Sequence, residues 1–231
     1  MKRSQMNTLI LEAREFFLSN GVHLPPFADW TPDDWAQKGN EVEEIVDCHL
    51  GWDVTDYGLN DFYRYGLMLF TLRNGSPRSW QRGFNKHYAE KVVILELNQT
   101  HQMHHHKRKM EDIINRRGGV LAMQVYNAAP DDTLDDTPVR VNLDGVWRTL
   151  PAGSVVYMRP GESISITPLL YHRFWAEEKR VLMGEVSDVN DDLSDNTFYQ
   201  LIGSGRFSEV EEDVPALRLL CNEYERYWKP R

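Results

Sequence analysis

The sequence predicts a mainly β fold, an antiparallel sandwich or barrel with α-helices in front of it. From about Trp52 onward, short apolar runs alternate with turn signals such as Asn74-Gly75, Asp144-Gly145 and Pro160-Gly161. Such dipeptides between apolar runs are typical of β-hairpins. Before that point the apolar residues recur at helical spacing. The chain has 231 residues, of which 41% are hydrophobic, and this is enough for one sizeable core.

Two helical segments are expected at the N-terminus. The first covers residues 8–18, with its apolar side chains on one stripe, and Asn20-Gly21 ends it. The second begins at Thr31-Pro32, an N-cap followed by proline at the first helical position, and continues with Val42 and Val46 facing inward. We expect residues 1–50 to form a helical elaboration packed on a β-barrel of residues 51–231, within a single structural domain.

Strands are expected wherever a short apolar run lies between two turn signals. The clearest are 120–126 and 181–186. The others cover residues 66–72, 91–97, 138–143, 153–158 and 163–167. The acidic and aromatic tail, 217–227, fits either an edge strand or a short helix.

Charge and composition exclude several classes of partner. The formal net charge of −9 disfavours nucleic acid and anionic membranes, and it suits a neutral polyol or a metal cation. No run approaches the roughly 20 apolar residues that a membrane-spanning helix needs. The first apolar stretch is broken at Glu12, which no signal peptide tolerates, so we expect a cytoplasmic protein. Cys48 and Cys221 are expected to be reduced, buried thiols.

The stretch from His101 to Glu111 carries the chemistry. On a strand, His104 and His106 point to one side and His105 to the other, so the first two can reach one cation at about 2.0–2.2 Å. Glu111 follows a turn and can supply a carboxylate. Another ligand must come from elsewhere, and His172 is the natural candidate because a predicted strand and turn immediately precede it.

Three imidazoles and one carboxylate leave two positions open on an octahedral cation. Such a site suits Mn(II), Fe(II), Ni(II) or Zn(II). Two adjacent open positions can bind either a bidentate substrate or dioxygen. On these grounds a sugar isomerase and a mononuclear iron dioxygenase are both possible, as is a non-catalytic sugar-binding protein with a structural metal.

The residues resemble the cupin family. His104-x-His106-x4-Glu111-x6-Gly118 is similar to the first cupin metal motif, and Gly161-x5-Thr167-x-Leu169-x2-His172 resembles the second. The sequence departs from the cupin pattern at several positions, although all four ligand positions are filled. Asn98 and Leu169 stand where glycine is usual, Thr167 where proline is usual, and Ala176 where asparagine is usual. The resemblance implies a double-stranded β-helix, or jelly-roll barrel, behind the N-terminal helices.

A closer resemblance, to the D-lyxose ketol-isomerases, runs over nearly the whole chain. It lies in segments that include Leu50-Gly51-Trp52-Asp53-Val54-Thr55, Leu69-Phe70-Thr71-Leu72-Arg73-Asn74-Gly75, Tyr88-Ala89-Glu90-Lys91, Tyr171-His172-x-Phe174-Trp175 and Gly184-Glu185-Val186-Ser187. It implies interconversion of D-lyxose with D-xylulose, and of D-mannose with D-fructose. It also implies a homodimer and a divalent metal, with Mn2+ expected first and Fe2+, Co2+, Ni2+ or Zn2+ as alternatives.

The resemblance also implies an acid–base pair, Glu111 and Glu185. A glutamate inside an apolar strand is costly to bury unpaired, which favours a role in the site for Glu185. Lys109, two residues before Glu111, is expected as a catalytic donor to a substrate oxygen. Expected substrate contacts are Lys109, Lys91, Glu90, Asp191 and Phe174.

Overall fold

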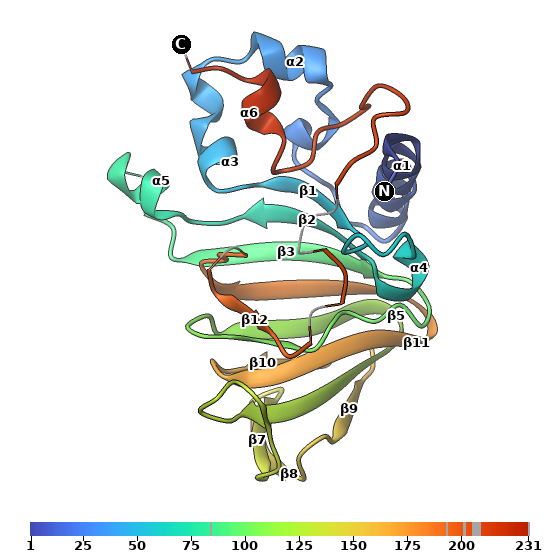
Figure 1. The fold of residues 1–231 in the computed structure, drawn as a ribbon, viewed down its shortest axis with the longest axis vertical. Helices are drawn as coiled ribbons and strands as arrows, with labels where there is room; N and C mark the ends of the chain where they lie inside the picture. The colour runs from blue at the N-terminus through green and yellow to red at the C-terminus, as the bar shows by residue number, and fades with distance from the viewer. Residues whose placement is uncertain (84, 193, 201, 205–208, 231) are drawn as a thin grey trace.

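The computed structural model describes residues 1–83, 85–192, 194–200, 202–204 and 209–230. Figure 1 shows strands stacked below a cap of helices, with both ends of the chain near that cap. The helices are α1 (Arg3–Ser19), α2 (Pro32–Gln37), α3 (Glu43–Asp47), α4 (Phe62–Tyr65), α5 (Pro77–Gln81) and α6 (Tyr224–Tyr227), with 3-10 turns η1 (Pro26–Asp29) and η2 (Asn40–Val42). The strands are β1 (Gly51–Thr55), β2 (Leu67–Arg73), β3 (Tyr88–Leu95), β4 (His104–His106), β5 (Glu111–Ala128), β6 (Leu134–Asp135), β7 (Val139–Leu143), β8 (Val146–Leu150), β9 (Val155–Met158), β10 (Ser163–Ile166), β11 (Leu170–Asp188) and β12 (Asn196–Phe198).

Two long strands, β5 and β11, organise the fold. They pair antiparallel along most of their length, and the register shifts between Glu177 and Val181. The first half of β11 also pairs with β4, and the second half pairs with β3. The strand order is β1-β2-β3-β11-β5-β10-β7-β8, with β4, β6, β9 and β12 attached off this path. This is the predicted mainly β, cupin-like jelly roll with N-terminal helices.

The main core fills the inside of this β structure. It combines inward residues of both halves of β5 and β11 with residues from the short strands, for example Leu121, Val181, Leu95 and Val156. Alternate residues of each strand face this core, because successive side chains in a strand point to opposite faces. The same alternation therefore decides which polar side chains project into the molecule near the histidines.

Helix α1 covers the outer face of the sheet. Its Ile10 and Phe17 pack with Trp52 of β1 and Phe70 of β2 in a second core. The helix begins five residues before the predicted Thr8.

The division of the chain at residue 50 stays a prediction. No helix within the described residues has the length and apolar character that a bilayer crossing requires.

The second predicted helix is confirmed at its start and wrong in its length. Thr31 caps α2 in a capping box with Asp34. The helix ends at Gln37 because Lys38 adopts an extended conformation, with ψ 148°. The chain then forms η2 and α3, which still bury Val42 and Val46.

The turn signals give mixed outcomes. Asp144 and Gly145 both have positive φ, 51° and 84°, and they close the predicted hairpin between β7 and β8. Asn74-Gly75 does not close a hairpin, because the chain enters α5 before it returns as β3. In the C-terminal tail the short-helix alternative is confirmed as α6, and Leu220 forms only an isolated parallel bridge to Trp52.

Candidate metal centre

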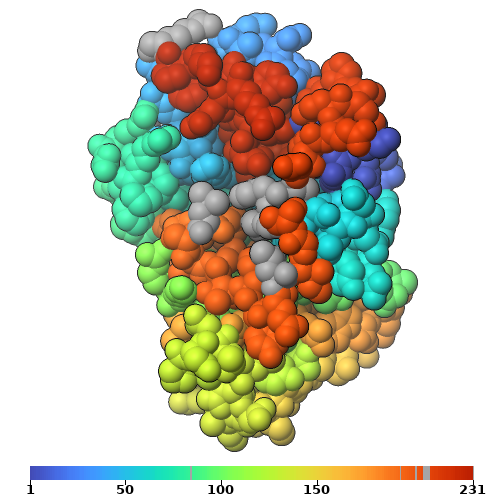
Figure 2. Space-filling model, in the orientation of Figure 1, coloured from blue at the N-terminus to red at the C-terminus, as the bar shows by residue number. Residues whose placement is uncertain are grey.

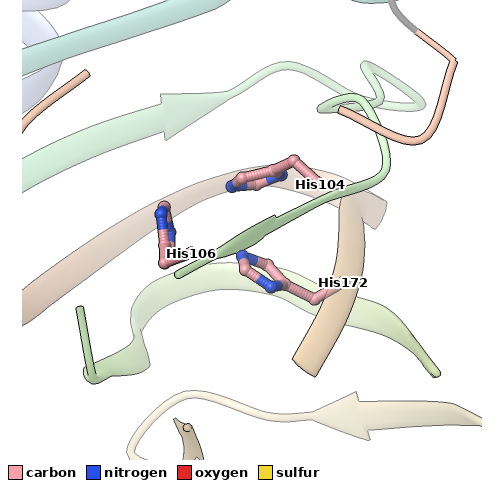
Figure 3. Close-up of side chains that lie close together, drawn as sticks. All are labelled: His104, His106 and His172. Carbon is pink, nitrogen blue, oxygen red and sulfur yellow. The ribbon is translucent and has the colours of Figure 1, made fainter. Parts of the chain in front are cut away.

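Three histidines converge inside the jelly roll, as Figure 3 shows. His104 and His106 come from the short strand β4, and His172 from β11, where it pairs directly with His104. One nitrogen from each ring lies within 4.8 Å of the other two. All three side chains are buried. The structure thus brings together the three imidazoles that the sequence singled out.

The hydrogen bonds of two rings fix which nitrogen faces the centre. Nδ1 of His104 donates to the carbonyl of Gln102 at 2.8 Å, and Nδ1 of His172 donates to the carbonyl of Leu170 at 3.0 Å. Because a carbonyl only accepts, the proton sits on Nδ1 and the Nε2 lone pair is free. Backbone bonds of this kind orient the histidine ligands of metal sites.

Several of these nitrogens lack a hydrogen bond. Within the described part of the chain, Nε2 of His172 and both ring nitrogens of His106 are buried without a hydrogen-bond partner. A buried polar atom left unpaired costs about 1–3 kcal/mol. A cation at the centre would satisfy Nε2 of His172 and Nε2 of His106, the two nitrogens that lie next to Glu111, so these residues fit a metal ion.

Glu111 opens β5 and turns its carboxylate to the same centre. Its Oε1 lies 3.1 Å from Nε2 of His172 and 3.4 Å from Nε2 of His106. Two ligands at about 2.1 Å from one ion are separated by roughly 3.0–3.4 Å when their bonds make angles of 90–109°. The carboxylate oxygen is therefore at the spacing of a neighbouring ligand.

A chain of buried charges extends from this carboxylate. Nζ of Lys109 lies 2.7 Å from Oε2 of Glu111 and donates to Oε1 of Glu185 at 3.0 Å. Lys91 donates to the same Glu185 oxygen at 2.9 Å. Both lysines also donate to the amide oxygen of Asn190, at 3.2 and 2.6 Å. Among the described residues, Oε2 of Glu185 has no hydrogen-bond partner.

The pKa values follow from burial and these charges. Burial, together with repulsion between the imidazoles, lowers the pKa of His104 well below its usual value, and burial also lowers the pKa of His106. For Glu111, burial alone would raise the pKa, but Lys109 and His106 lower it well below the ordinary range. For Lys109, attraction to Glu111 and Glu185 outweighs burial and raises the pKa. The expected states are neutral imidazoles at His104 and His106, a carboxylate at Glu111 and an ammonium at Lys109.

The space around these groups is small. A small cavity has a volume of about 30 Å³, and we call it the inner chamber. It is lined by the charged groups of Lys91, Lys109 and Glu185 and by His104, His106 and Glu111. Asp192 and Asn196 line it on the polar side. Phe174 lines its apolar side and stacks on His172, with ring centroids 6.4 Å apart.

Two predicted substrate contacts lie elsewhere. The side chain of Glu90 pairs with Arg73 and is 38% exposed. Lys91 points inward, so its neighbour Glu90 must point outward, and the structure does not bring Glu90 to the chamber. Asp191 accepts from the backbone of Ser194 at 3.0 Å and lines two outer cavities rather than the chamber. His105 points away from the centre, where its ring packs edge-on against Tyr171.

Sequence reasoning missed two side chains that contact residues of the site. Asn190 accepts a hydrogen bond from each of the two lysines. His101 lines the chamber beside His104, and its Nδ1 shares a 2.7 Å hydrogen bond with the Tyr57 hydroxyl. Residues 57 and 101 have no local pattern that links them, so no sequence signal points to this pair.

Comparison with known proteins identifies the family. A statistical model of the D-lyxose isomerase family matches residues 1–224. The D-lyxose/D-mannose isomerase of Serratia proteamaculans is 49% identical over 230 residues, covering 98% of this chain and 99% of the relative. A protein of the same name from Escherichia coli O157:H7 is 46% identical and covers 98% of this chain and 100% of the relative.

Solved structures share the fold at low sequence identity. The L-ribose isomerase of Cellulomonas parahominis, solved with L-ribose, has a TM-score of 0.59 and 17% identity over 91% of this chain and 98% of its own. The Acinetobacter sp. DL28 L-ribose isomerase also has a TM-score of 0.59, with 15% identity and the same coverage. The near full-length match to the family and its curated members shows that the chain is a sugar isomerase belonging to the D-lyxose isomerase family.

Proposed function

We propose that the protein is a metal-dependent aldose–ketose isomerase. It interconverts D-lyxose with D-xylulose and, on the same site, D-mannose with D-fructose. The relatives that share 46–49% of the sequence carry the name D-lyxose/D-mannose isomerase. The single observation that carries the proposal is the convergence of three buried imidazoles on a carboxylate that continues into a lysine–glutamate chain.

His104, His106, His172 and Glu111 are the proposed metal ligands. Three neutral nitrogens and one carboxylate form a donor set suited to a divalent first-row ion, and we take Mn2+ as the first candidate, with Fe2+, Co2+, Ni2+ and Zn2+ as alternatives. When bound, such an ion would supply Lewis-acid polarisation of two adjacent substrate oxygens.

Glu185 is the proposed base for the carbon-bound proton. Its Oε1 is held by Lys91 and Lys109, which leaves Oε2 available inside the inner chamber. Removal of the proton at C2 of the open-chain aldose, with protonation of O1, gives an enediol. Return of the proton at C1, with loss of the proton on O2, gives the ketose. Hydrogen bonds from two ammonium groups to the other oxygen hold this carboxylate in position.

Lys109 and Glu111 are proposed to handle the hydroxyl proton. Lys109 bridges the two carboxylates and can donate to a substrate oxygen as negative charge develops on it. Lys91 and Phe174 are the proposed polar and apolar substrate contacts. Neither a mononuclear iron dioxygenase nor a non-catalytic sugar-binding protein requires two lysines and two glutamates to be buried together beside the histidines.

One assay tests this proposal. The protein is stripped of metal, reloaded with Mn2+, and incubated in D2O with D-lyxose, D-mannose, L-ribose and D-xylose. We expect D-xylulose from D-lyxose and D-fructose from D-mannose, with deuterium in the product because the transferred proton exchanges with solvent. Absence of ketose from all four aldoses, with metal content verified, would contradict the proposal. A homodimeric state and a cytoplasmic location stay predictions.

A further inference from the structure

A cavity of about 400 Å³ lies next to the inner chamber, and we call it the outer cavity. Its wall is formed by residues of β1 and β2, the segments that follow α3, β2 and β11, and the C-terminal tail. The residues that line it include Asp53, Thr71, Asn74, Asn190, Asp192 and Asn222. Figure 2 shows the loop after β11, in orange, at the surface beside the blue-green residues around α5.

The sheet register makes the two spaces neighbours. Thr71 of β2 pairs directly with Lys91 of β3, and Lys91 pairs with Glu185 of β11. Side chains at directly paired positions lie on the same face with Cβ atoms about 4.5–5.5 Å apart. The row from Glu185 through Lys91 to Thr71 therefore leads from the inner chamber into the outer cavity. Asp192 lines both spaces.

The inner chamber is too small for a whole sugar. Its volume of about 30 Å³ is room for about two water molecules. The reacting carbons, C1 and C2, must lie near the histidines, so the rest of the chain has to extend into a neighbouring space. The outer cavity is of the size that small-molecule sites have, about 300–1,000 Å³.

Thr71 gives the outer cavity a polar group suited to a hydroxyl. Its side chain is 6% exposed and lines the cavity. Among the described residues its hydroxyl has no hydrogen-bond partner. The loop side supplies Asn190, which is fixed by two bonds from Asn74: the Asn74 amide donates to the Asn190 carbonyl at 3.0 Å, and its oxygen accepts from the Asn190 N–H at 2.9 Å.

A third space, beyond His101, is a less suitable route. It has a volume of about 290 Å³, and His101 separates it from the chamber. The His101 ring is held against His104 and Phe174, with centroids 4.6 and 4.8 Å away, and by its bond to Tyr57. This packing closes that side. Asp192, in the loop after β11, borders both the inner chamber and the outer cavity.

We infer that the outer cavity is the subsite for the distal carbons of the sugar, and that Thr71 binds a distal hydroxyl there. This rests on the proposed isomerase function. D-mannose has the configuration of D-lyxose at C2, C3 and C4 and one further hydroxymethyl carbon. The outer cavity accommodates that carbon, and its free volume decides whether the protein accepts a hexose as a substrate in addition to a pentose.

Variants at Thr71 test the effect of its hydroxyl and the effect of the cavity volume separately. Thr71→Ser keeps the hydroxyl, Thr71→Val removes it at constant shape, and Thr71→Phe fills the cavity near Lys91. We expect Thr71→Val to lower kcat/KM for D-mannose about 5–10-fold through KM, and Thr71→Ser about twofold or less. Thr71→Phe is expected to lower kcat/KM for both sugars, because the distal carbons of D-lyxose also extend beyond the inner chamber, and the loss for D-mannose is expected to be at least sixfold larger than the loss for D-lyxose.

Asn222→Trp narrows the same cavity from its exposed rim, with Asn222→Ala as its control, in case Thr71→Phe fails to fold. The thermal midpoint and the binding of Mn2+ report the fold of every variant. Equal losses for D-mannose and D-lyxose in the folded filling variants would overturn the subsite, as would wild-type protein that converts D-lyxose but never D-mannose. If wild-type protein forms no ketose from any aldose, the isomerase proposal itself fails, and the subsite fails with it.

Discussion

Lys109 lies between two carboxylates: its ammonium group is 2.7 Å from Glu111 and 3.0 Å from Glu185. Both glutamates are buried, and one of them faces the three histidines. This lysine therefore couples the proposed metal ligand to the proposed base through a single charge. The first two predictions concern these three residues.

Replacing Glu185 with glutamine removes the base but keeps its shape. We expect kcat to fall about 10²–10⁴-fold, the range for loss of a positioned proton-transfer group, with metal content unchanged. Steady-state kinetics and metal analysis check this. Glu90→Gln is the matched control, because this outward-facing neighbour of Lys91 should lose less than twofold. Retention of full activity by Glu185→Gln would remove Glu185 from the mechanism.

Lys109→Met makes metal binding more sensitive to acid. Lys109 lowers the pKa of Glu111, so its removal raises that pKa, and a protonated carboxyl cannot serve as a ligand. Between pH 7.5 and 5.5 we expect the affinity of the variant for Mn2+ to fall at least about tenfold more than that of the wild type. Isothermal titration at several pH values measures this. The exposed neighbour Lys107→Met should follow the wild-type profile.

The metal-free protein should lose stability as the solution is acidified. The pKa values of His104 and His106 are lowered in the folded state. Below about pH 6.5 these two histidines therefore bind protons in the unfolded chain but not in the folded one. The free energy of unfolding therefore falls as pH drops through that range. Urea denaturation at pH 7.5, 6.5 and 5.5 tests the effect. A His104→Asn, His106→Asn variant should show a flatter profile, and an identical slope would contradict this explanation.

Arg3 ties the two ends of the chain together. It is 1% exposed and pairs with the buried Glu223 and with Glu212, both more than 200 residues away. Arg3→Met leaves Glu223 buried without its cation, and we expect a loss of about 3–5 kcal/mol in the free energy of unfolding. The double variant with Glu223→Gln should recover part of that loss. Arg14→Met, in the exposed pair with Asp29, should cost at most about 1 kcal/mol.

Local periodicity predicted much of the fold and the histidine cluster. Strand alternation separates His104 and His106 from His105, and it is visible in the sequence alone. The same rule, applied to Glu90 and Lys91, excludes one of the two from the interior, yet both were expected as substrate contacts. The early end of α2 was missed although Gly39 and Asn40, directly after Lys38, form a helix stop signal.

Contacts between distant segments explain the remaining misses. Asn190 reaches both lysines because the loop after β11 folds back over β3, and Asn74, 116 residues away, holds it there. Arg3 and Glu223 meet only because the C-terminal tail returns to α1. No spacing within one sequence reports such pairings, since they depend on how whole elements pack.

Anomalous X-ray scattering from crystals loaded with Mn2+ tests the central claim most directly. We expect one manganese peak about 2.0–2.3 Å from a nitrogen of His104, His106 and His172 and from a carboxylate oxygen of Glu111. No peak among these four side chains at saturating Mn2+, or a peak there that lacks His172 as a ligand, would contradict the account.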